Sequence, residues 1–162
     1  MMSSSLITAL LWAAALGSGL IAGIYFGFST FIMKAFNKIE APHTVAAMNS
    51  INEVITRSLF MPLFFGSTMV SLLLVIVAIS NWNEAGSVIM LTAGLVYFFG
   101  MFVCTVIFNV PLNNRLAKIE ATDSNVGQVW LHYRKYWTRW NHLRTVSSLI
   151  TCALSIQLLT NA

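Results

Sequence analysis

The side chains that could support chemistry in this 162-residue chain gather beside its apolar stretches. Trp137, Asn141 and Arg144 occupy positions i, i+4 and i+7, which lie on one face of a helix. Asn109 and Asn113 are likewise four residues apart. Amides and a guanidinium that converge with aromatic rings at one depth are typical of a pocket for a small, apolar, planar ligand. The side chains predicted to bind such a ligand are Ser29, Asn52, Asn109, Asn113, Tyr133, Trp137 and Trp140.

Proton transfer in such a pocket would need a base, and histidine is the candidate that this sequence offers. His43 and His142 are preferred over His132, because a partly buried, neutral imidazole near a cation keeps its lone pair at pH 7. The alternative is a structural network, in which asparagines tie helices together and Arg144 caps backbone carbonyls or a lipid phosphate. The predicted catalytic residues are His142, His43, Asn141 and Arg144.

The sequence predicts no metal site and no resident cofactor. It contains no HxxH, HxxxH or CxxC pair, and both Cys104 and Cys152 lie inside apolar stretches. A haem held by two of the three histidines, or a bound quinone, stays open as an alternative. The formal net charge of +4 is explained by contact with anionic lipid headgroups, so no nucleic-acid partner is predicted.

The elements that must position these residues are four apolar stretches without a single Lys, Arg, Asp or Glu. A chain that is 57% apolar and 9% charged has too little charge for the surface of a soluble protein. Roughly 20 apolar residues span the hydrocarbon as a helix, and no period-2 alternation suggests a barrel strand. The sequence therefore predicts an all-α protein embedded in the lipid bilayer. The four stretches are 6–33, 59–82, 86–114 and 145–162.

All nine Lys and Arg residues fall between the first and second stretches or between the third and fourth. With four crossings these two segments, within 34–58 and 115–144, must lie on the same side of the membrane. Cytoplasmic loops carry an excess of basic residues. We therefore expect a multi-pass protein of the inner (plasma) membrane, with both basic loops in the cytoplasm and both termini outside.

Helical periodicity continues beyond two of the stretches. Pro42 suits the first turn of a helix that runs into the second stretch, where Pro62 should kink or break it. Asp123 and Ser124 are the predicted N-cap of the fourth helix. Helices two and four should therefore extend into the cytoplasm. The predicted helices, packed as an antiparallel four-helix transmembrane bundle in one domain of residues 1–162, cover about 6–36, 43–80, 86–118 and 124–160.

The first helix carries Gly19, Gly23 and Gly27 at a spacing of four. Small residues at this spacing let two helix backbones approach closely in lipid. Packing within the bundle is the simpler interpretation of this stripe. A homo-oligomer through the same face is the alternative.

Four motifs together resemble the DUF1772 family of small four-helix membrane proteins, which are grouped with the anthrone oxygenases. The resemblance extends from about residue 6 to residue 159. An Asn-x-Pro-x-Asn followed by a Trp-x-x-x-Asn-x-x-Arg is its most specific part. The motifs are Gly23-Ile-Tyr-Phe-Gly27-Phe-Ser29, Met48-Asn-Ser-Ile-Asn52, Asn109-Val-Pro111-Leu-Asn113 and Trp137-Thr-Arg-Trp-Asn141-His-Leu-Arg144-Thr.

This resemblance implies oxidation of an anthrone-type or related phenolic or quinol substrate by molecular oxygen, without a metal. His142 or His43 would remove a proton from the central methylene, and the resulting carbanion would pass an electron to oxygen. Amides and Arg144 would hydrogen-bond the enolate oxygen, while Trp137, Trp140 and Tyr133 stack on the rings. The competing hypothesis is a non-catalytic quinone-, haem- or lipid-binding subunit with the same pocket.

Overall fold

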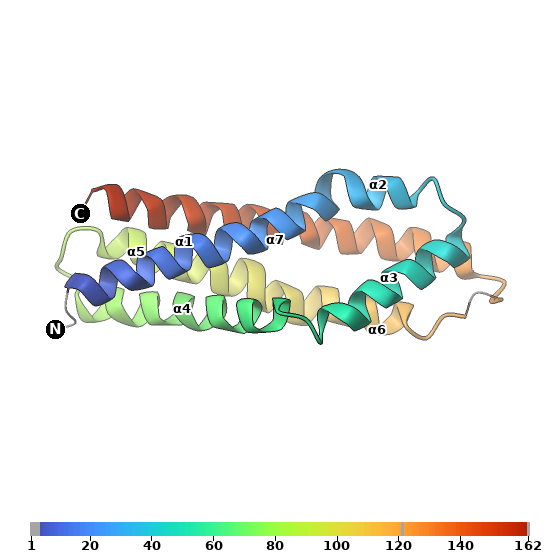
Figure 1. Ribbon diagram of the computed structural model, residues 1–162, viewed down its shortest axis with the longest axis horizontal. Coiled ribbons are helices and arrows are strands. Elements are labelled where there is room, and N and C mark those ends of the chain that lie inside the picture. Colours follow the sequence, from blue (N-terminus) through green and yellow to red (C-terminus); the bar gives the residue numbers. More distant parts are fainter. Residues whose placement is uncertain (1–3, 121, 162) are drawn as a thin grey trace.

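The computed structural model describes residues 4–120 and 122–161, which form helices joined by short turns (Figure 1). Four helical spans are long and apolar enough to cross a membrane. They lie side by side in an elongated bundle, in which α1 (Ser4–Gly27) begins and α7 (Val126–Thr160) ends at the same end. The structure therefore confirms the all-α four-helix fold of a multi-pass membrane protein. The four spans are Ser5–Phe36, Phe60–Ser80, Ser87–Leu116 and Val126–Thr160.

Wide π-helical turns interrupt the first and third spans. In the first, η1 (Phe28–Ile32) joins α1 to α2 (Met33–Phe36). In the third, η2 (Phe98–Val103) and η3 (Thr105–Asn109) separate α5 (Ser87–Tyr97) from α6 (Val110–Leu116). The Thr105 hydroxyl donates back to the Met101 carbonyl at 2.7 Å, and Pro111 has no N–H to donate. Such π turns often occur at functional sites, because they rotate the following side chains around the helix axis.

The second helix is broken before Pro62. It consists of α3 (Ala41–Ile55), with Pro42 in its first turn as predicted, and α4 (Phe60–Ser80). Between them the Ser58 hydroxyl accepts a hydrogen bond from the Phe60 N–H (3.2 Å) and donates to the Ile55 carbonyl (2.9 Å). Pro62 is the third residue of α4, where its missing N–H costs little because the first turn has no carbonyl to bond. The helix predicted over about 43–80 is thus divided near Pro62, as that proline indicated.

The fourth helix, α7, has 35 residues without interruption. At 1.5 Å per residue it is about 52 Å long, well beyond the roughly 30 Å of a hydrocarbon layer. Its N-cap is Asn125, without a side-chain cap. The predicted N-cap at Asp123 and Ser124 is wrong, because the Asp123 carboxylate instead accepts the Glu120 N–H at 3.0 Å in the preceding turn.

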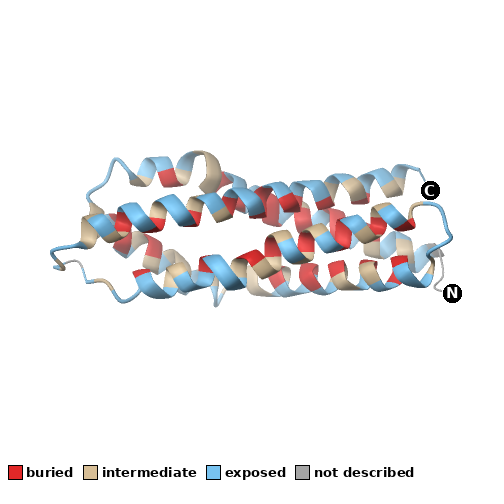
Figure 2. Cartoon of the chain, turned by 180° about the vertical axis from the view of Figure 1, so that it is seen from behind, coloured by how far each residue is buried: buried red, intermediate tan, exposed pale blue. Residues whose placement is uncertain are grey.

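Buried residues occur along the whole length of the bundle (Figure 2). Near the chain ends they form an aliphatic cluster that includes Leu11, Leu74 and Val77. At the opposite end they form a cluster that also contains aromatic rings, among them Trp130 and Tyr133. The helices meet through small residues, since lipid offers no hydrophobic drive for association and close packing must hold the bundle together.

The glycines that allow close helix contact are not those of the predicted stripe. A Cβ at Gly94 would lie 2.6 Å from the Ser71 carbonyl oxygen of α4, which is closer than real Cβ atoms approach. In contrast, Gly23 is exposed and a Cβ there would meet nothing within 4 Å. Gly19 only approaches the Cys152 sulfur, at 3.4 Å. A homo-oligomer through the Gly19, Gly23 and Gly27 face stays a prediction.

We expect Gly94→Ala to lower the melting temperature in mild detergent by about 2–12 °C, because overpacking costs typically 1–3 kcal/mol. Gly23→Ala is the matched control and should leave the monomer's melting temperature unchanged or slightly raised. Differential scanning fluorimetry of both variants provides the comparison. An unchanged melting temperature in Gly94→Ala would show that α4 and α5 do not meet this closely.

Candidate functional site

Asn141 is the centre of a buried polar cluster between α1 and α7. Its side chain is fully buried, and its Nδ2 donates to the Tyr25 carbonyl and to the Ser29 hydroxyl, both at 2.7 Å. Its Oδ1 accepts a hydrogen bond from Arg144 Nη2, also at 2.7 Å. The π turn η1 begins one residue before Ser29, so the widened helix presents this hydroxyl toward α7. Asn141 thereby fixes the position of Arg144 relative to the first helix.

Arg144 is a buried cation, with 3% of its surface exposed. Its guanidinium carbon lies 4.1 Å from the centroid of the Tyr25 ring and 5.0 Å from that of Trp137. Nη1 lies 3.5 Å from the Thr105 hydroxyl, and Nε has no hydrogen-bond partner. Aromatic faces attract a cation, but they carry no net charge to neutralise it.

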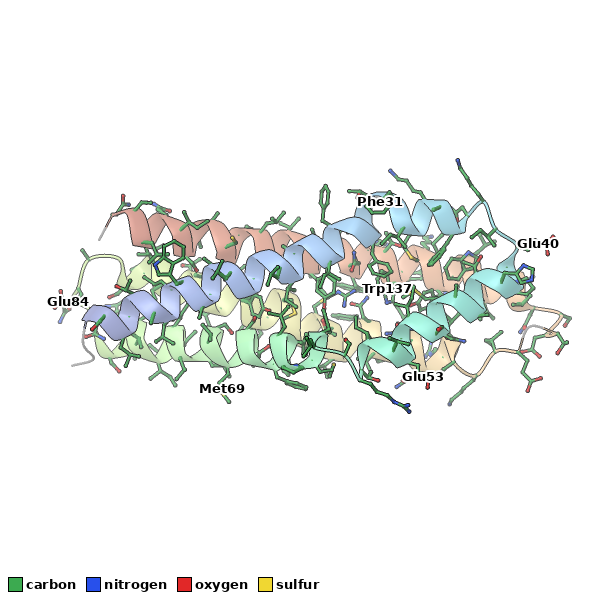
Figure 3. All side chains as sticks on the ribbon, viewed as in Figure 1. Phe31, Glu40, Glu53, Met69, Glu84 and Trp137 are labelled. Atoms are coloured by element: carbon green, nitrogen blue, oxygen red, sulfur yellow. The ribbon has the colours of Figure 1, made fainter. Side chains whose placement is uncertain are left out.

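No carboxylate faces this guanidinium. All five acidic side chains of the sequence belong to the described residues; four are exposed, and the fifth, Asp123, is half-buried in the turn before α7. Figure 3 shows Trp137 inside the bundle, whereas Glu40, Glu53 and Glu84 lie at its periphery. Over the residues that the structure describes, the single ion pair joins Arg57 to Glu53 at the surface, at 3.8 Å.

A second set of hydrogen bonds ties the third span to α7. Asn109 is buried, and its Nδ2 donates to the Trp137 carbonyl at 3.3 Å. The Tyr133 hydroxyl donates to Asn113 Oδ1 at 2.9 Å. For Asn109, this hydrogen bond agrees with the structural interpretation of the asparagines, because it links the third span to the backbone of α7. Asn113 has a second role, because it also lines a cavity.

That cavity has a volume of about 270 Å³, just below the usual range of about 300–1,000 Å³ for ligand pockets. It lies where the break between α3 and α4 leaves room beside η2, η3 and α7. Most of its wall is aromatic or aliphatic, and Arg144 lies at its polar side. The residues that line it are Ile24, Tyr25, Phe28, Met48, Ile51, Asn52, Ile55, Thr56, Phe60, Met61, Phe64, Phe65, Phe102, Thr105, Val106, Val110, Asn113, Trp137 and Arg144.

Three buried polar atoms of this lining have no hydrogen-bond partner: Asn52 Nδ2, Trp137 Nε1 and Arg144 Nε. All three are donors. Buried donors without acceptors are rare in proteins, and each such group calls for an explanation. An acceptor-rich ligand in the cavity would supply the missing partners.

A second, polar hollow adjoins the pocket. The two share Asn52, Thr56, Val110 and Asn113 as walls. The hollow is larger, about 630 Å³, and Glu53 is among the residues that line it. Asn52 and Asn113 thus separate an apolar pocket from a polar space that water can occupy.

The structure brings most of the predicted site residues together, but not all of them. Asn52, Asn113, Trp137 and Arg144 line the pocket. Behind them lie Asn141, Asn109, Ser29 and Tyr133, which hold the lining in place through hydrogen bonds. Trp140 does not line the pocket, because its ring stacks on Phe108, with 3.7 Å between centroids.

Both proposed bases lie outside the pocket. His43 and His142 are exposed, so the expectation that these imidazoles are partly buried is wrong. His142 follows Asn141 directly, and one step along a helix turns a side chain by about 100°. It lines a separate surface hollow together with Lys34, Arg134 and Arg139.

Sequence reasoning missed Tyr25, Thr105 and the phenylalanines of the pocket. A signal existed for Thr105, because Thr105, Asn109 and Asn113 follow one another at a spacing of four. A similar signal existed for Phe60 and Phe64. Tyr25 belongs to the first of the four family motifs, but no spacing placed its ring beside Arg144, since that position depends on how α1 packs against α7. Among the described residues no group of three or more His, Cys, Asp or Glu side chains is placed to hold a metal ion.

Fold and site together define a multi-pass membrane bundle with an aromatic pocket and a buried arginine. Residues 57–154 match the family described as anthrone oxygenase, and this match covers more than half of the chain. The chain therefore belongs to the anthrone oxygenase family, as its motifs predicted. Comparison with curated proteins finds no match, and comparison with solved structures finds none. The matched segment includes Asn109, Asn113, Asn141 and Arg144, whereas Tyr25 and Asn52 precede it.

Proposed function

We propose that the pocket binds a planar phenolic, anthrone-type or quinol-type substrate and exposes it to molecular oxygen. The observation that carries this proposal is an aromatic cavity that ends at a buried guanidinium without a counter-charge. Aromatic edges and faces from Phe60, Phe64 and Trp137 suit a flat, fused ring system. Arg144 suits an oxygen on that ring system on which negative charge develops.

The reaction follows from the acidity of a methylene next to a conjugated carbonyl. Loss of one proton leaves an enolate, whose oxygen Arg144, with the Asn52 and Trp137 donors, would hydrogen-bond. The carbanion passes one electron to O2, the resulting radical and superoxide combine, and a carbon–oxygen bond forms. The peroxide then loses water as its O–O bond and the remaining C–H bond break. The CH2 group and O2 thus become C=O and H2O, so no external reductant is consumed.

Membrane orientation is part of this proposal. Thr105, beside Arg144, lies 18 residues after Ser87, or about 27 Å along a helix. A hydrocarbon layer of roughly 30 Å would place the guanidinium near its boundary on the side of the basic loops. By the charge rule this is the cytoplasmic side of the plasma membrane, with both termini outside. An apolar substrate would then reach the pocket from the bilayer edge.

The proposal is tested by oxygen uptake with anthrone as the probe, on protein reconstituted into lipid nanodiscs. The expected result is one O2 consumed for each anthraquinone formed. Ile51→Trp should lower the turnover by about 10-fold or more, because Ile51 lines the pocket and the larger ring would fill it. Val54→Trp is the matched control, since Val54 is exposed on the same helix and does not line the pocket. Equal turnover in both variants would place the reaction elsewhere.

Exposure of the histidines leads to a separate prediction. We expect His43→Ala and His142→Ala each to retain at least about half of the wild-type turnover, because neither side chain reaches the pocket wall. The same oxygen-uptake assay measures both. A fall of 100-fold in either variant, with an unchanged melting temperature, would return that imidazole to the role of general base.

A non-catalytic subunit that binds a quinone, a haem or a lipid is the second candidate function. The unpaired donors of the pocket would also satisfy the carbonyl oxygens of a quinone. Absorption spectroscopy of the protein purified in mild detergent distinguishes the two candidates. A retained chromophore, together with no oxygen uptake on anthrone, would favour the binding function.

A further inference from the structure

The charge of Arg144 is unbalanced inside the bundle. The titratable groups that face it are Tyr25 from α1, Cys104 from the third span and Tyr133 from α7. Phenols and thiols in their ordinary state are neutral near pH 7. The other contacts are the Trp137 ring, the Asn141 amide and the Thr105 hydroxyl, which are neutral as well. A buried cation without an opposite charge is costly, and an anion bound beside it would lower that cost.

The pocket also offers no group that could take up a proton. Among its described lining residues there is no Asp, Glu, His or Lys. The unpaired polar atoms of the lining are donors only. A neutral acid that entered the pocket would meet the Arg144 cation and the N–H groups of Asn52 and Trp137, all of which favour its conjugate base.

We propose that the pocket binds its ligand as a planar aromatic anion, with the negative charge beside Arg144 and without a protein base in the pocket. The class of ligand comprises phenolates, enolates and aromatic carboxylates of two or three fused rings. A ligand proton would leave to water in the adjoining polar hollow, past Asn52 and Asn113, which belong to the shared wall. This inference rests on the proposed function in taking this pocket to be the substrate site, but it concerns binding and not turnover.

The test compares two fluorescent ligands of the same shape, anthracene-2-carboxylate and the neutral anthracene-2-carboxamide. Neither can undergo the proposed oxidation. Both are titrated at pH 7.4 into wild-type protein in phosphatidylcholine nanodiscs, with empty nanodiscs subtracted. The carboxylate should bind at least 10-fold more tightly than the carboxamide.

Four variants locate that preference. Arg144→Gln should abolish it, whereas Arg139→Gln should keep it, because Arg139 is an exposed cation five residues earlier on the same helix. Asn141→Asp should also abolish it while Arg144 is still present. This change puts a carboxylate where Asn141 Oδ1 now lies, 2.7 Å from Arg144 Nη2, and so supplies an internal counter-charge. Arg144→Met, which should not lower the stability of the protein, should abolish the preference as well and keeps the inference testable if Arg144→Gln or Asn141→Asp fails to fold.

Equal affinity for the two ligands in the wild type would overturn the inference, as would a preference that survives in both Arg144→Gln and Asn141→Asp. Loss of the preference when phosphatidylglycerol replaces phosphatidylcholine would overturn it in favour of an anionic lipid headgroup beside Arg144. The two proposals fail separately. Anion preference without anthrone oxidation removes the oxygenase function alone, and anthrone oxidation without anion preference removes this inference alone.

Discussion

We expect Arg144→Met to lower anthrone turnover by about 10²–10³-fold without lowering the stability of the protein. The loss of turnover follows from removal of a preorganised positive charge next to the developing enolate and peroxide, for which losses of this size are typical. The unchanged stability follows from burial. Replacing an uncompensated buried cation with an apolar side chain of similar length removes a desolvation cost of several kcal/mol, which offsets the loss of the hydrogen bond to Asn141 Oδ1.

Two measurements on the same nanodisc sample check this prediction: oxygen uptake and the melting temperature. Arg139→Met is the matched control, because it removes an exposed charge from the same helix and should change neither quantity by much. If Arg144 were only structural, Arg144→Met would lower the melting temperature strongly. That result, with turnover per folded molecule unchanged, would contradict the proposed role.

Asn141→Ala should have the largest effect on stability. Asn141 is fully buried and bonds three groups, so its removal leaves the Ser29 hydroxyl, the Tyr25 carbonyl and Arg144 each without one partner. Breaking a buried polar network at a charged group typically costs about 3–5 kcal/mol. For a chain of this size the corresponding drop in melting temperature is roughly 6–20 °C.

Asn114→Ala provides the control for Asn141→Ala. Asn114 is an exposed asparagine in α6, and its truncation should change the melting temperature by no more than about 2 °C. Thermal unfolding in mild detergent, followed by circular dichroism at 222 nm, gives both values. A drop of the same small size in both variants would show that the cluster around Asn141 does not hold α1 against α7.

The helix boundaries show where sequence reasoning was sufficient and where it was not. Pro42 begins a helix as predicted, because a fixed φ and a missing N–H suit a first turn whatever surrounds it. The exact position of the helix break, between Ile55 and Phe60, could not be predicted from the sequence. A proline indicates that a helix is disturbed nearby, but the exact residues depend on which local hydrogen bonds, here those of Ser58, replace the helical ones.

In the candidate site, too, the sequence predicted the position of some side chains and not of others. Arg144 and Asn141 were predicted from their spacing, and the structure places both in one buried cluster. Trp140 and His142 belong to the same motif but lie outside the pocket. Adjacent residues of a helix point in directions about 100° apart. Which of them faces the pocket depends on how α7 packs against α1 and the third span.

By itself, the sequence determined the membrane class, the four helices and the family. Those properties depend on sums over many residues, such as apolar length, the absence of charge and the separation of basic residues, and such sums hardly depend on tertiary contacts. Only the tertiary structure decided that the pocket contains an unpaired arginine and no base. That outcome depends on the rotation of each helix about its axis, which the π turns and the break before α4 set locally. Rotating α7 about its axis by one residue position, about 100°, would place His142 where Asn141 now lies.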